Sequence, residues 1–287
     1  MKILITGSSG MIGGYVVKGL IDKGHTVIGI DRVKPKVEHD GLTPVVLDLS
    51  SKEDVMRVFE ENKLDRCIHL AALAHTKGVA DTSWEAFKRV NVDMAENVFE
   101  ACVKNNVPVL FISTVDAIGM VKGLITPETK MNPISSYGKS KAMAEGRLKE
   151  FCKDWNIYRF SPVYTEDVKR DIQKRYYLKY PDWAYLIGRG QQFEVLNVKK
   201  AVSSMVDWVD KDVDNTIHII KDDVLLDSAK VIAEERAEGR AKHVLRIPRW
   251  MVVCGYYCIR LVFGKSNITY LVFKALWPFR TADNLSV

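Results

Sequence analysis

The sequence lacks an uninterrupted apolar run long enough for a membrane-spanning helix. Such a helix needs about 20 apolar residues, and Arg260, Lys265 and Lys274 interrupt the most apolar C-terminal stretches. The opening stretch, MKILITGSSG, has only a short apolar run broken by glycines and serines. It lacks the long apolar core of a secretory signal. We therefore expect a cytoplasmic protein.

Cysteine is also scarce, which argues against disulfide and metal frameworks. The five cysteines are scattered along the chain, at Cys67, Cys102, Cys152, Cys254 and Cys258. An odd, scattered set does not predict a disulfide framework, and the last two have no partners at zinc-site spacing. We expect buried free thiols and no metal site.

Composition is that of an ordinary globular protein. With 287 residues, 47% of them hydrophobic and 27% charged, the chain can form one large domain or two unequal lobes. The net charge is +6, but the basic residues form no stripe with interleaved aromatics, so nucleic acid is not an expected partner. In the last 50 residues cations mix with aromatics, a combination that suits an anionic substrate or a membrane surface.

Strand and helix patterns alternate through the first half of the chain. The helical pattern is clearest at 83–102, where apolar residues recur at spacings of three and four. Alternation of this kind predicts an α/β fold with a doubly wound parallel sheet, whose ligands bind beyond the carboxyl ends of the strands. The short branched apolar runs expected to be strands are 2–6, 26–31, 45–49, 67–71, 109–113 and 157–161.

The alternation of strand and helix patterns becomes irregular after residue 162. We expect a dinucleotide-binding lobe at 1–162 and a smaller C-terminal substrate lobe at 163–287. Helical patterns return at 198–210 and 226–238, and the segment 193–212 can rejoin the first lobe.

Three glycines mark the first turn of the predicted sheet. Gly7, Gly10 and Gly13 follow a predicted strand and open an amphipathic helix. In that context glycines permit a tight turn and let the backbone approach a pyrophosphate at the positive helix N-terminus. The pattern predicts dinucleotide binding.

Acidic residues after the next strands bear on which dinucleotide binds. Asp31 closes the second predicted strand, where a carboxylate can accept hydrogen bonds from both ribose hydroxyls, which favours NAD. The neighbouring Arg32 can pair with a 2′-phosphate, so NADP remains an alternative. Asp48 is placed either to reach the adenine edge or to serve the start of a helix near Ser50 and Ser51.

Several motifs together resemble the extended short-chain dehydrogenase/reductases, which include nucleotide-sugar epimerases, dehydratases and reductases. The motifs are TGSSGMIG (6–13), HLAA (69–72), Asn91, STVDAIG (113–119) and YGKSK (137–141), and the resemblance runs to about residue 220. It implies a Rossmann lobe, a nicotinamide cofactor, hydride transfer, a nucleotide-diphosphate sugar substrate and a homodimer. The residues expected to bind the cofactor are Gly7, Ser9, Gly10, Met11, Ile12, Gly13, Asp31, Arg32, Asp48, Leu49, Leu70, Ala71, Ala72, Tyr137, Lys141 and Val163.

Tyr137 and Lys141 are the predicted proton-transfer pair. On a helix they share one face, so the ammonium can stabilise a phenolate and lower a phenol pKa that is ordinarily near 10. Taken alone, the same spacing also suits two amphipathic side chains on a surface helix. The resemblance implies a catalytic role for both and for Thr114. We expect structural roles for Ser113 and Asn91.

Departures from the family pattern bear on the reaction. Val115 stands where dehydratases of this family carry the first acid of a pair, which disfavours dehydration. Pro162 stands where the epimerases carry a substrate-contacting asparagine. Similar apolar replacements are found in a branch that resembles 4-ketoreductases of UDP-linked N-acetyl-6-deoxyhexosamines. This resemblance implies a 4-keto-sugar reductase used in surface-polysaccharide synthesis. A 4-epimerase and a non-catalytic dinucleotide sensor are the alternatives.

The C-terminal half offers weaker candidates. The apolar, cation-flanked stretch 250–263 is expected to be either an interfacial helix on a membrane or a core or dimer-contact helix. Residues that could pair with a diphosphate or stack on a base, with a solvated surface role as the alternative for each, are Arg170, Lys174, Arg175, Arg189, Arg249, Tyr176 and Tyr177.

Overall fold

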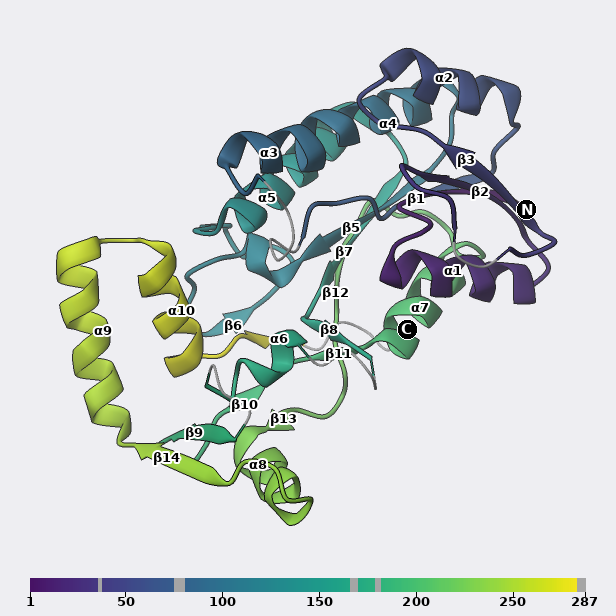
Figure 1. Ribbon diagram of the computed structural model, residues 1–287. Coiled ribbons are helices and arrows are strands. Elements are labelled where there is room, and N and C mark those ends of the chain that lie inside the picture. Colours follow the sequence, from purple (N-terminus) through teal and green to yellow (C-terminus); the bar gives the residue numbers. More distant parts are fainter. Residues whose placement is uncertain (36–37, 75–80, 166–169, 179–181, 283–287) are drawn as a thin grey trace.

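A seven-stranded, fully parallel sheet forms the centre of the protein (Figure 1). The computed structural model describes residues 1–35, 38–74, 81–165, 170–178 and 182–282. The strand order is β3-β2-β1-β4-β5-β7-β12, so the chain starts in the middle and builds outward in both directions. This confirms the predicted doubly wound Rossmann fold. The strands are β1 (Lys2–Thr6), β2 (Thr26–Asp31), β3 (Leu42–Val46), β4 (Arg66–His69), β5 (Val109–Thr114), β7 (Trp155–Phe160) and β12 (Ile217–Ile220).

Helices cover both faces of this sheet (Figure 1). On one face lie α2 (Lys52–Glu61), α4 (Met94–Lys104) and α5 (Ser136–Phe151), and their apolar sides enclose one core cluster. On the other face α1 (Met11–Asp22) packs against α7 (Val198–Trp208) over a second cluster. Because both faces are buried, the central strands are continuous apolar runs.

Some elements differ in their bounds from the sequence prediction. The third strand ends at Val46 rather than at residue 49, so Asp48 lies in the loop after it. The helix predicted at 83–102 is divided into α3 (Trp84–Lys88), a π-helical turn η1 (Arg89–Asp93) and α4. π-turns inside helices are often found at functional sites, and this one carries Asn91.

Later parts of the chain contribute both to the main sheet and to a separate cluster. Helix α7 and strand β12 complete the main layers, and β11 (Leu196–Asn197) pairs with β8 (Val163–Tyr164). We propose that the smaller lobe is the region around a third apolar cluster. Its elements are α6 (Arg170–Gln173), β9 (Trp183–Ile187), β10 (Gln192–Phe193), β13 (Leu226–Asp227), α8 (Ser228–Ala237) and β14 (His243–Ile247).

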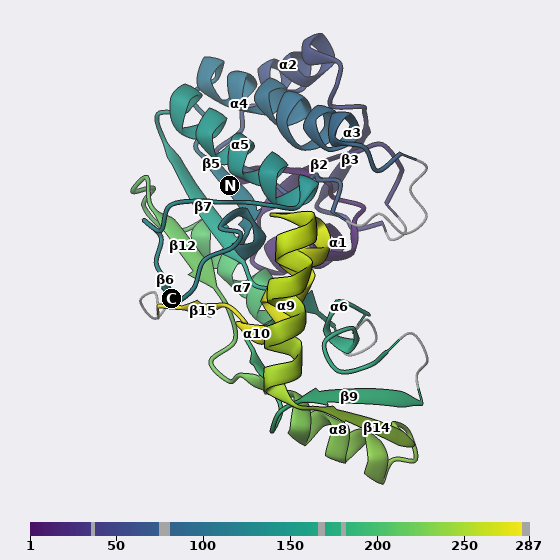
Figure 2. The ribbon, with the colours of Figure 1, turned by 90° about the vertical axis from the view of Figure 1, so that its left-hand side faces the viewer.

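A helical hairpin lies near the end of the described chain. Helix α9 (Arg249–Phe263) packs against α10 (Asn267–Leu276), and Figure 2 shows α9 on the outer side of the hairpin. The chain then returns as β15 (Arg280–Thr281), which pairs with β6 (Leu124–Ile125). Within the described residues, no helix combines the length and apolarity that crossing a bilayer requires.

The cysteines differ from expectation at one end of the chain. Cys67, Cys102 and Cys152 are buried free thiols, as expected. Cys254 and Cys258 on α9 are exposed, so the expectation of buried thiols was wrong for them. The reason is that α9 buries only one side, through Tyr256.

Gly13 provides a test of how tightly the first turn is packed. A Cβ at Gly13 would lie 2.1 Å from the Gly7 carbonyl oxygen, whereas a Cβ at Gly14 would meet nothing within 4 Å. We expect Gly13→Ala to lower the free energy of unfolding by more than about 2 kcal/mol, since backbone must move. Gly14→Ala, the matched control, should raise it by roughly 0.5–1 kcal/mol. Urea denaturation measures both, and equal effects would contradict this packing.

Candidate functional site

The glycine turn leaves the start of α1 open toward an anion. Gly10 is the N-cap residue and makes no side-chain capping hydrogen bond, and the first turn of α1 holds no acidic residue. Met11 is exposed and Ile12 is half-buried at this end. The unpaired N–H groups and the helix dipole therefore favour a negatively charged group here.

Asp31 holds this turn in place from the end of β2. One carboxylate oxygen accepts a hydrogen bond from the Ser9 N–H (3.0 Å), and the other accepts one from the Val33 N–H (3.3 Å). The Ser9 hydroxyl donates to the Val33 carbonyl (2.9 Å). Each carboxylate oxygen can accept a second hydrogen bond. Asp31 can therefore still accept ribose hydroxyls in this position.

Arg32 follows β2 and Asp48 follows β3, and both are exposed. Asp48 accepts a hydrogen bond from the Ser50 N–H (2.9 Å). Hydrogen bonds from Ser50 lower the pKa of Asp48, with Arg32 as a further contributor. Asp48 thus orders the loop that leads to Ser51, the N-cap of α2, which supports the alternative role predicted for it. The next residue, Leu49, is buried.

The segment after β4 lies directly against the glycine turn. Thr6 Oγ1 is 2.8 Å from His69 Nδ1 and accepts a hydrogen bond from the Ala71 N–H (3.2 Å). Leu70 and Ala71 are half-buried, whereas Ala72 is exposed. The structure therefore brings the HLAA motif and the glycine motif together at the switch point between β1 and β4.

Asn91 joins this segment to α5. Its amide oxygen accepts a hydrogen bond from the Leu73 N–H (2.7 Å), and its amide nitrogen donates to Ser140 Oγ (2.8 Å). Ser140 in turn donates to the Tyr137 carbonyl (2.8 Å). The predicted structural role of Asn91 is confirmed, because its hydrogen bonds fix the loop after β4 against the first turn of α5.

Tyr137 and Lys141 lie one turn apart near the start of α5. Ser135 caps the helix by accepting from the Gly138 N–H (2.9 Å). Lys141 is 1% exposed, and its Nζ lies 3.9 Å from the ring centroid of Phe111 on β5. The burial of Lys141 excludes the alternative of a surface pair.

Electrostatics at this pair differ from expectation. Burial lowers the pKa of Lys141 to about 7, although Glu145 opposes the change. Burial and the Asp116 carboxylate raise the pKa of the Tyr137 phenol. The expected lowering of the Tyr137 pKa was therefore wrong for the protein alone. Lys141 contributes less positive charge in the folded protein than a solvated ammonium does at neutral pH.

Helix α5 also carries one partner of a buried ion pair, Glu145, one turn beyond Lys141. Glu145 is fully buried, and Arg159 of β7 donates to it at 2.7 Å through Nη2. Ser113 of β5 also donates to Glu145, which confirms the predicted structural role of Ser113. These contacts fix α5 across the strand ends that carry Thr114.

Asp116 follows Thr114 in the turn η2 (Val115–Ala117), where Thr114 Oγ1 accepts from the Asp116 N–H (3.2 Å). Its carboxylate accepts hydrogen bonds from Ser135, from Tyr270 (2.8 Å) and from Lys274 (3.0 Å). Burial raises the pKa of this carboxyl, but Lys274 and the hydrogen bonds outweigh burial and lower it overall.

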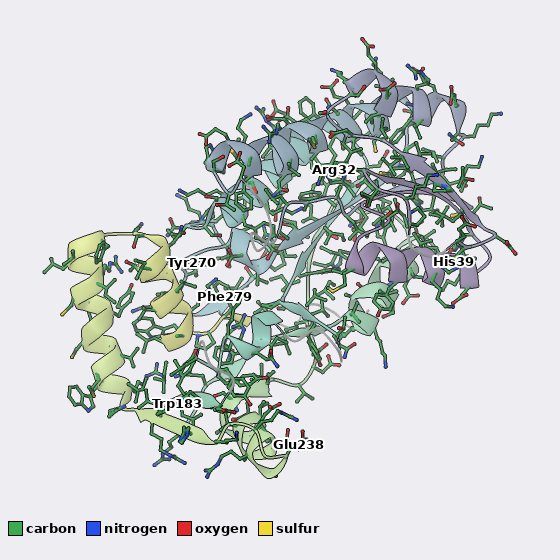
Figure 3. The ribbon with its side chains drawn as sticks, viewed as in Figure 1. Arg32, His39, Trp183, Glu238, Tyr270 and Phe279 are labelled. Atoms are coloured by element: carbon green, nitrogen blue, oxygen red, sulfur yellow. The ribbon has the colours of Figure 1, made fainter. Side chains whose placement is uncertain are left out.

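The sequence reasoning missed these partners of Asp116. Figure 3 labels Tyr270 on helix α10. Both Tyr270 and Lys274 belong to this helix, far along the chain from Asp116. The only local signal was their spacing of four residues, which places both on one side of a helix.

The turn η2 and helix α5 meet backbone to backbone. A Cβ at Gly138 would lie 2.4 Å from the Asp116 carbonyl oxygen. Glycine at this position therefore allows the Thr114 segment and the Tyr137 turn to approach closely.

The candidate residues in the C-terminal half have different surroundings in the structure. Tyr176 is buried, and the Tyr177 hydroxyl donates to Glu235 (2.7 Å), so both serve the packing of the third cluster. Arg249 donates to the Leu276 carbonyl (3.0 Å). Arg189 lines a cavity of about 340 Å³ together with Arg236 and Arg246.

The remaining candidates are less informative. Arg175 lies over the ring of Phe193, 4.8 Å from its centroid, and Lys174 is exposed. The Arg170 side chain lies outside the described residues. Val163, on β8, is half-buried and pairs with Leu196.

The arrangement fits a dinucleotide. A helix N-terminus without acid or side-chain cap faces the glycine turn, Asp31 is fixed beside it, and a buried lysine and a tyrosine follow at the next strand ends. These are the elements that doubly wound folds use for a pyrophosphate and a ribose. The sequence model of the NAD dependent epimerase/dehydratase family matches residues 3–212. The chain belongs to this family.

The chain is similar to individual members of the family over only part of their length. The chain is 28% identical over 194 residues to an uncharacterized UDP-glucose epimerase, YtcB, of Bacillus subtilis, which covers 60% of each protein. It is 28% identical to a probable low-salt glycan biosynthesis reductase, Agl14, of Haloferax volcanii, which covers 57% of this chain and 54% of that protein. The chain thus matches little more than half the length of these relatives.

A solved structure supports the fold. The UDP-glucuronic acid 4-epimerase of Bacillus cereus, in complex with NAD, superposes with a TM-score of 0.71 at 20% identity. The superposition covers 87% of this chain and 88% of that one.

Tyr270 tests the attachment of α10 to the Asp116 carboxylate. Tyr270→Phe removes one hydrogen bond to a buried, charged acceptor, so we expect the free energy of unfolding to fall by about 1.5–3 kcal/mol. The matched control is Tyr257→Phe on the exposed side of α9, where the change should stay within about 0.5 kcal/mol. Thermal or urea denaturation checks both. The same small effect in both variants would argue against this attachment.

Lys141 tests the cost of burying an ammonium group. The unfolded chain keeps the Lys141 proton up to about pH 10.5 and the folded protein releases it near pH 7. The cost to stability is therefore full below about pH 7 and declines as the pH rises toward 10.5. We expect Lys141→Met to raise the free energy of unfolding of the cofactor-free protein near pH 6 by a few kcal/mol, since each pKa unit is worth about 1.4 kcal/mol.

The increase in the free energy of unfolding caused by Lys141→Met should be much smaller near pH 10 than near pH 6. Urea denaturation at the two pH values measures it. Lys139→Met, at an exposed position two residues earlier, is the control and should show little change at either pH. A gain from Lys141→Met that is independent of pH would contradict this account.

Proposed function

We propose that the protein is an NAD-dependent oxidoreductase that acts at C4 of a nucleotide-diphosphate sugar. The main support is the placement of Tyr137 and the buried Lys141 beside the Thr114 segment, at the same edge of the sheet as the glycine turn. Family membership supports the cofactor. So does the position of Asp31, whose carboxylate would repel a 2′-phosphate, although Arg32 keeps NADP as an alternative.

The predicted residues of the glycine turn, Asp31 and the three predicted catalytic residues then have chemical tasks. The glycine turn and the N-terminus of α1 hold the pyrophosphate, Asp31 holds the adenosine ribose, and Lys141 holds the nicotinamide ribose. The bound nicotinamide supplies or accepts the hydride at C4. Tyr137 Oη gives a proton to the C4 oxygen during reduction or removes it during oxidation, and the Thr114 hydroxyl orients that oxygen.

A reductase of 4-keto sugars is our first candidate for the net reaction. Pro162 offers no side-chain hydrogen bond where the related epimerases carry an asparagine. Asp116 accepts three hydrogen bonds that tie it to Ser135, Tyr270 and Lys274, so it is a poor donor of a proton to a leaving hydroxyl. This argues against dehydration. The likeness to a glycan-biosynthesis reductase is consistent with this choice.

A 4-epimerase is the second candidate, favoured by the likeness to UDP-glucose epimerases. Both candidates use the same proton transfer and differ in whether the sugar turns over before the hydride returns. A non-catalytic sensor is disfavoured because the chain keeps both Tyr137 and Lys141. The homodimer expected from the resemblance remains a prediction.

One pair of assays separates the candidates. A reductase consumes NADH stoichiometrically when it is given a UDP-linked 4-keto-6-deoxy-N-acetylhexosamine. An epimerase interconverts UDP-glucose and UDP-galactose, or their N-acetyl forms, with no net change in NADH. NADH absorbance and NMR of the sugar distinguish the two outcomes. Cofactor binding without turnover in either assay would support the sensor.

Tyr137 tests the proposed proton transfer. We expect Tyr137→Phe to keep cofactor affinity, measured by calorimetry, and to lower kcat by about 10²–10⁴-fold, the usual contribution of a general acid or base. Tyr15→Phe, on the exposed side of α1, is the matched control and should keep kcat. Activity in Tyr137→Phe close to that of the natural chain would remove this mechanism.

A further inference from the structure

Helix α9 presents an apolar stripe that the described chain leaves exposed. Its members recur at spacings of three and four and share one side of the helix: Trp250, Met251, Cys254, Tyr257, Cys258, Leu261 and Val262. Leu261 is 88% exposed and Val262 is 72% exposed. Exposed apolar patches of this kind mark interaction surfaces. We call these seven residues the α9 stripe.

The opposite side of the same helix is packed. Tyr256 is fully buried, and its ring lies 6.3 Å from that of Phe273 and 5.1 Å from that of Trp277. Helix α9 is therefore packed on one side and exposes apolar side chains on the other. Figure 2 shows the helix itself at the outside of the protein. Ile268 and Leu271, exposed at the start of α10, extend the apolar surface beyond the turn.

Charge around the stripe has one sign. Between residues 240 and 281 the sequence has eight lysines and arginines and no aspartate or glutamate. Four of these cations are exposed near the two ends of α9, and no ion pair to a carboxylate is found for them within the described residues: Arg246, Arg249, Arg260 and Lys265. The stripe is thus flanked by positive charge at both ends.

This combination fits an anionic surface that accepts apolar side chains. A helix with one apolar side, aromatic residues and flanking cations can lie in the interface of a bilayer and bury that side among the lipids. A second copy of this face is a poorer partner, because in a two-fold contact the same cations meet each other. We propose that the α9 stripe docks the protein peripherally on an anionic lipid bilayer.

The docking face lies next to the candidate site. The inner side of α10 carries Tyr270 and Lys274, which bond Asp116 beside the start of α5. Deleting the hairpin would therefore disturb the site as well as the stripe. Point substitutions on the outer side of α9 are the cleaner test, and vesicle binding is measured without turnover, so the result does not depend on the proposed function.

Vesicle flotation of the full chain tests the proposal. We expect the protein to bind vesicles that contain phosphatidylglycerol, more weakly those of phosphatidylcholine alone, and less at high salt. Leu261→Ser combined with Val262→Ser should lower the binding at least tenfold, because two inserted side chains lose their burial. Val224→Ser, which changes a loop valine that is 78% exposed, is the matched control and should bind unchanged.

A charge variant completes the test. Arg246→Gln combined with Lys265→Gln should weaken binding to the anionic vesicles by roughly tenfold and leave binding to phosphatidylcholine little changed. Circular dichroism checks that every variant is folded. Failure of the natural chain to bind either vesicle would overturn the proposal. So would a dimer in sedimentation experiments that Leu261→Ser with Val262→Ser converts to a monomer, since the face would then be a contact between copies.

Discussion

The ion pair between Glu145 and Arg159 is the contact on which the arrangement of the site depends. Glu145 is fully buried, and its charge is matched by the guanidinium of Arg159 and by the Ser113 hydroxyl. Removing one partner of such a pair leaves an uncompensated charge in the interior, which is strongly destabilising. The pair therefore fixes one register of α5 against β5 and β7, and that register determines where Tyr137 and Lys141 lie.

A second set of polar contacts fixes the other end of the same helix. Asp116 links the turn after β5 to the N-cap Ser135 and to α10. The start of α5 is thus attached to two distant parts of the sequence, the turn after β5 and α10. The two sets differ in setting: the Glu145 pair lies inside the sheet-facing core, whereas the Asp116 cluster joins the main layers to the C-terminal hairpin.

The sequence was most informative where local rules act alone. Strand and helix alternation predicted the parallel sheet, and the glycine spacing after β1 predicted the nucleotide end, because both follow from backbone geometry within about 20 residues. The Tyr137 and Lys141 pair was found through its spacing and the family resemblance. Its pKa values could not be predicted, since burial and the carboxylate of Asp116 come from the tertiary structure.

Contacts between segments far apart in the sequence could not be predicted either. Nothing near Asp116 in the sequence indicates that Tyr270 and Lys274 will bond it. The seventh strand β12 and the outward side of α9 likewise became visible only once the layers were assembled. The apolar, cation-flanked stretch 250–263 was expected to be a helix, but the sequence could not show which side of that helix is covered.

The close contact at Gly138 has a consequence for how substitutions act on this protein. The start of α5 contacts the turn after Thr114 through main-chain atoms. The segments that carry Thr114 and Tyr137 therefore cannot approach more closely without a main-chain clash, and this contact sets the gap between them. Exposed side chains on α5 can change without altering that gap. The exposed side of the helix is therefore free to vary. Any side chain larger than hydrogen at position 138 would push the start of α5 away from the turn after Thr114 and widen the site.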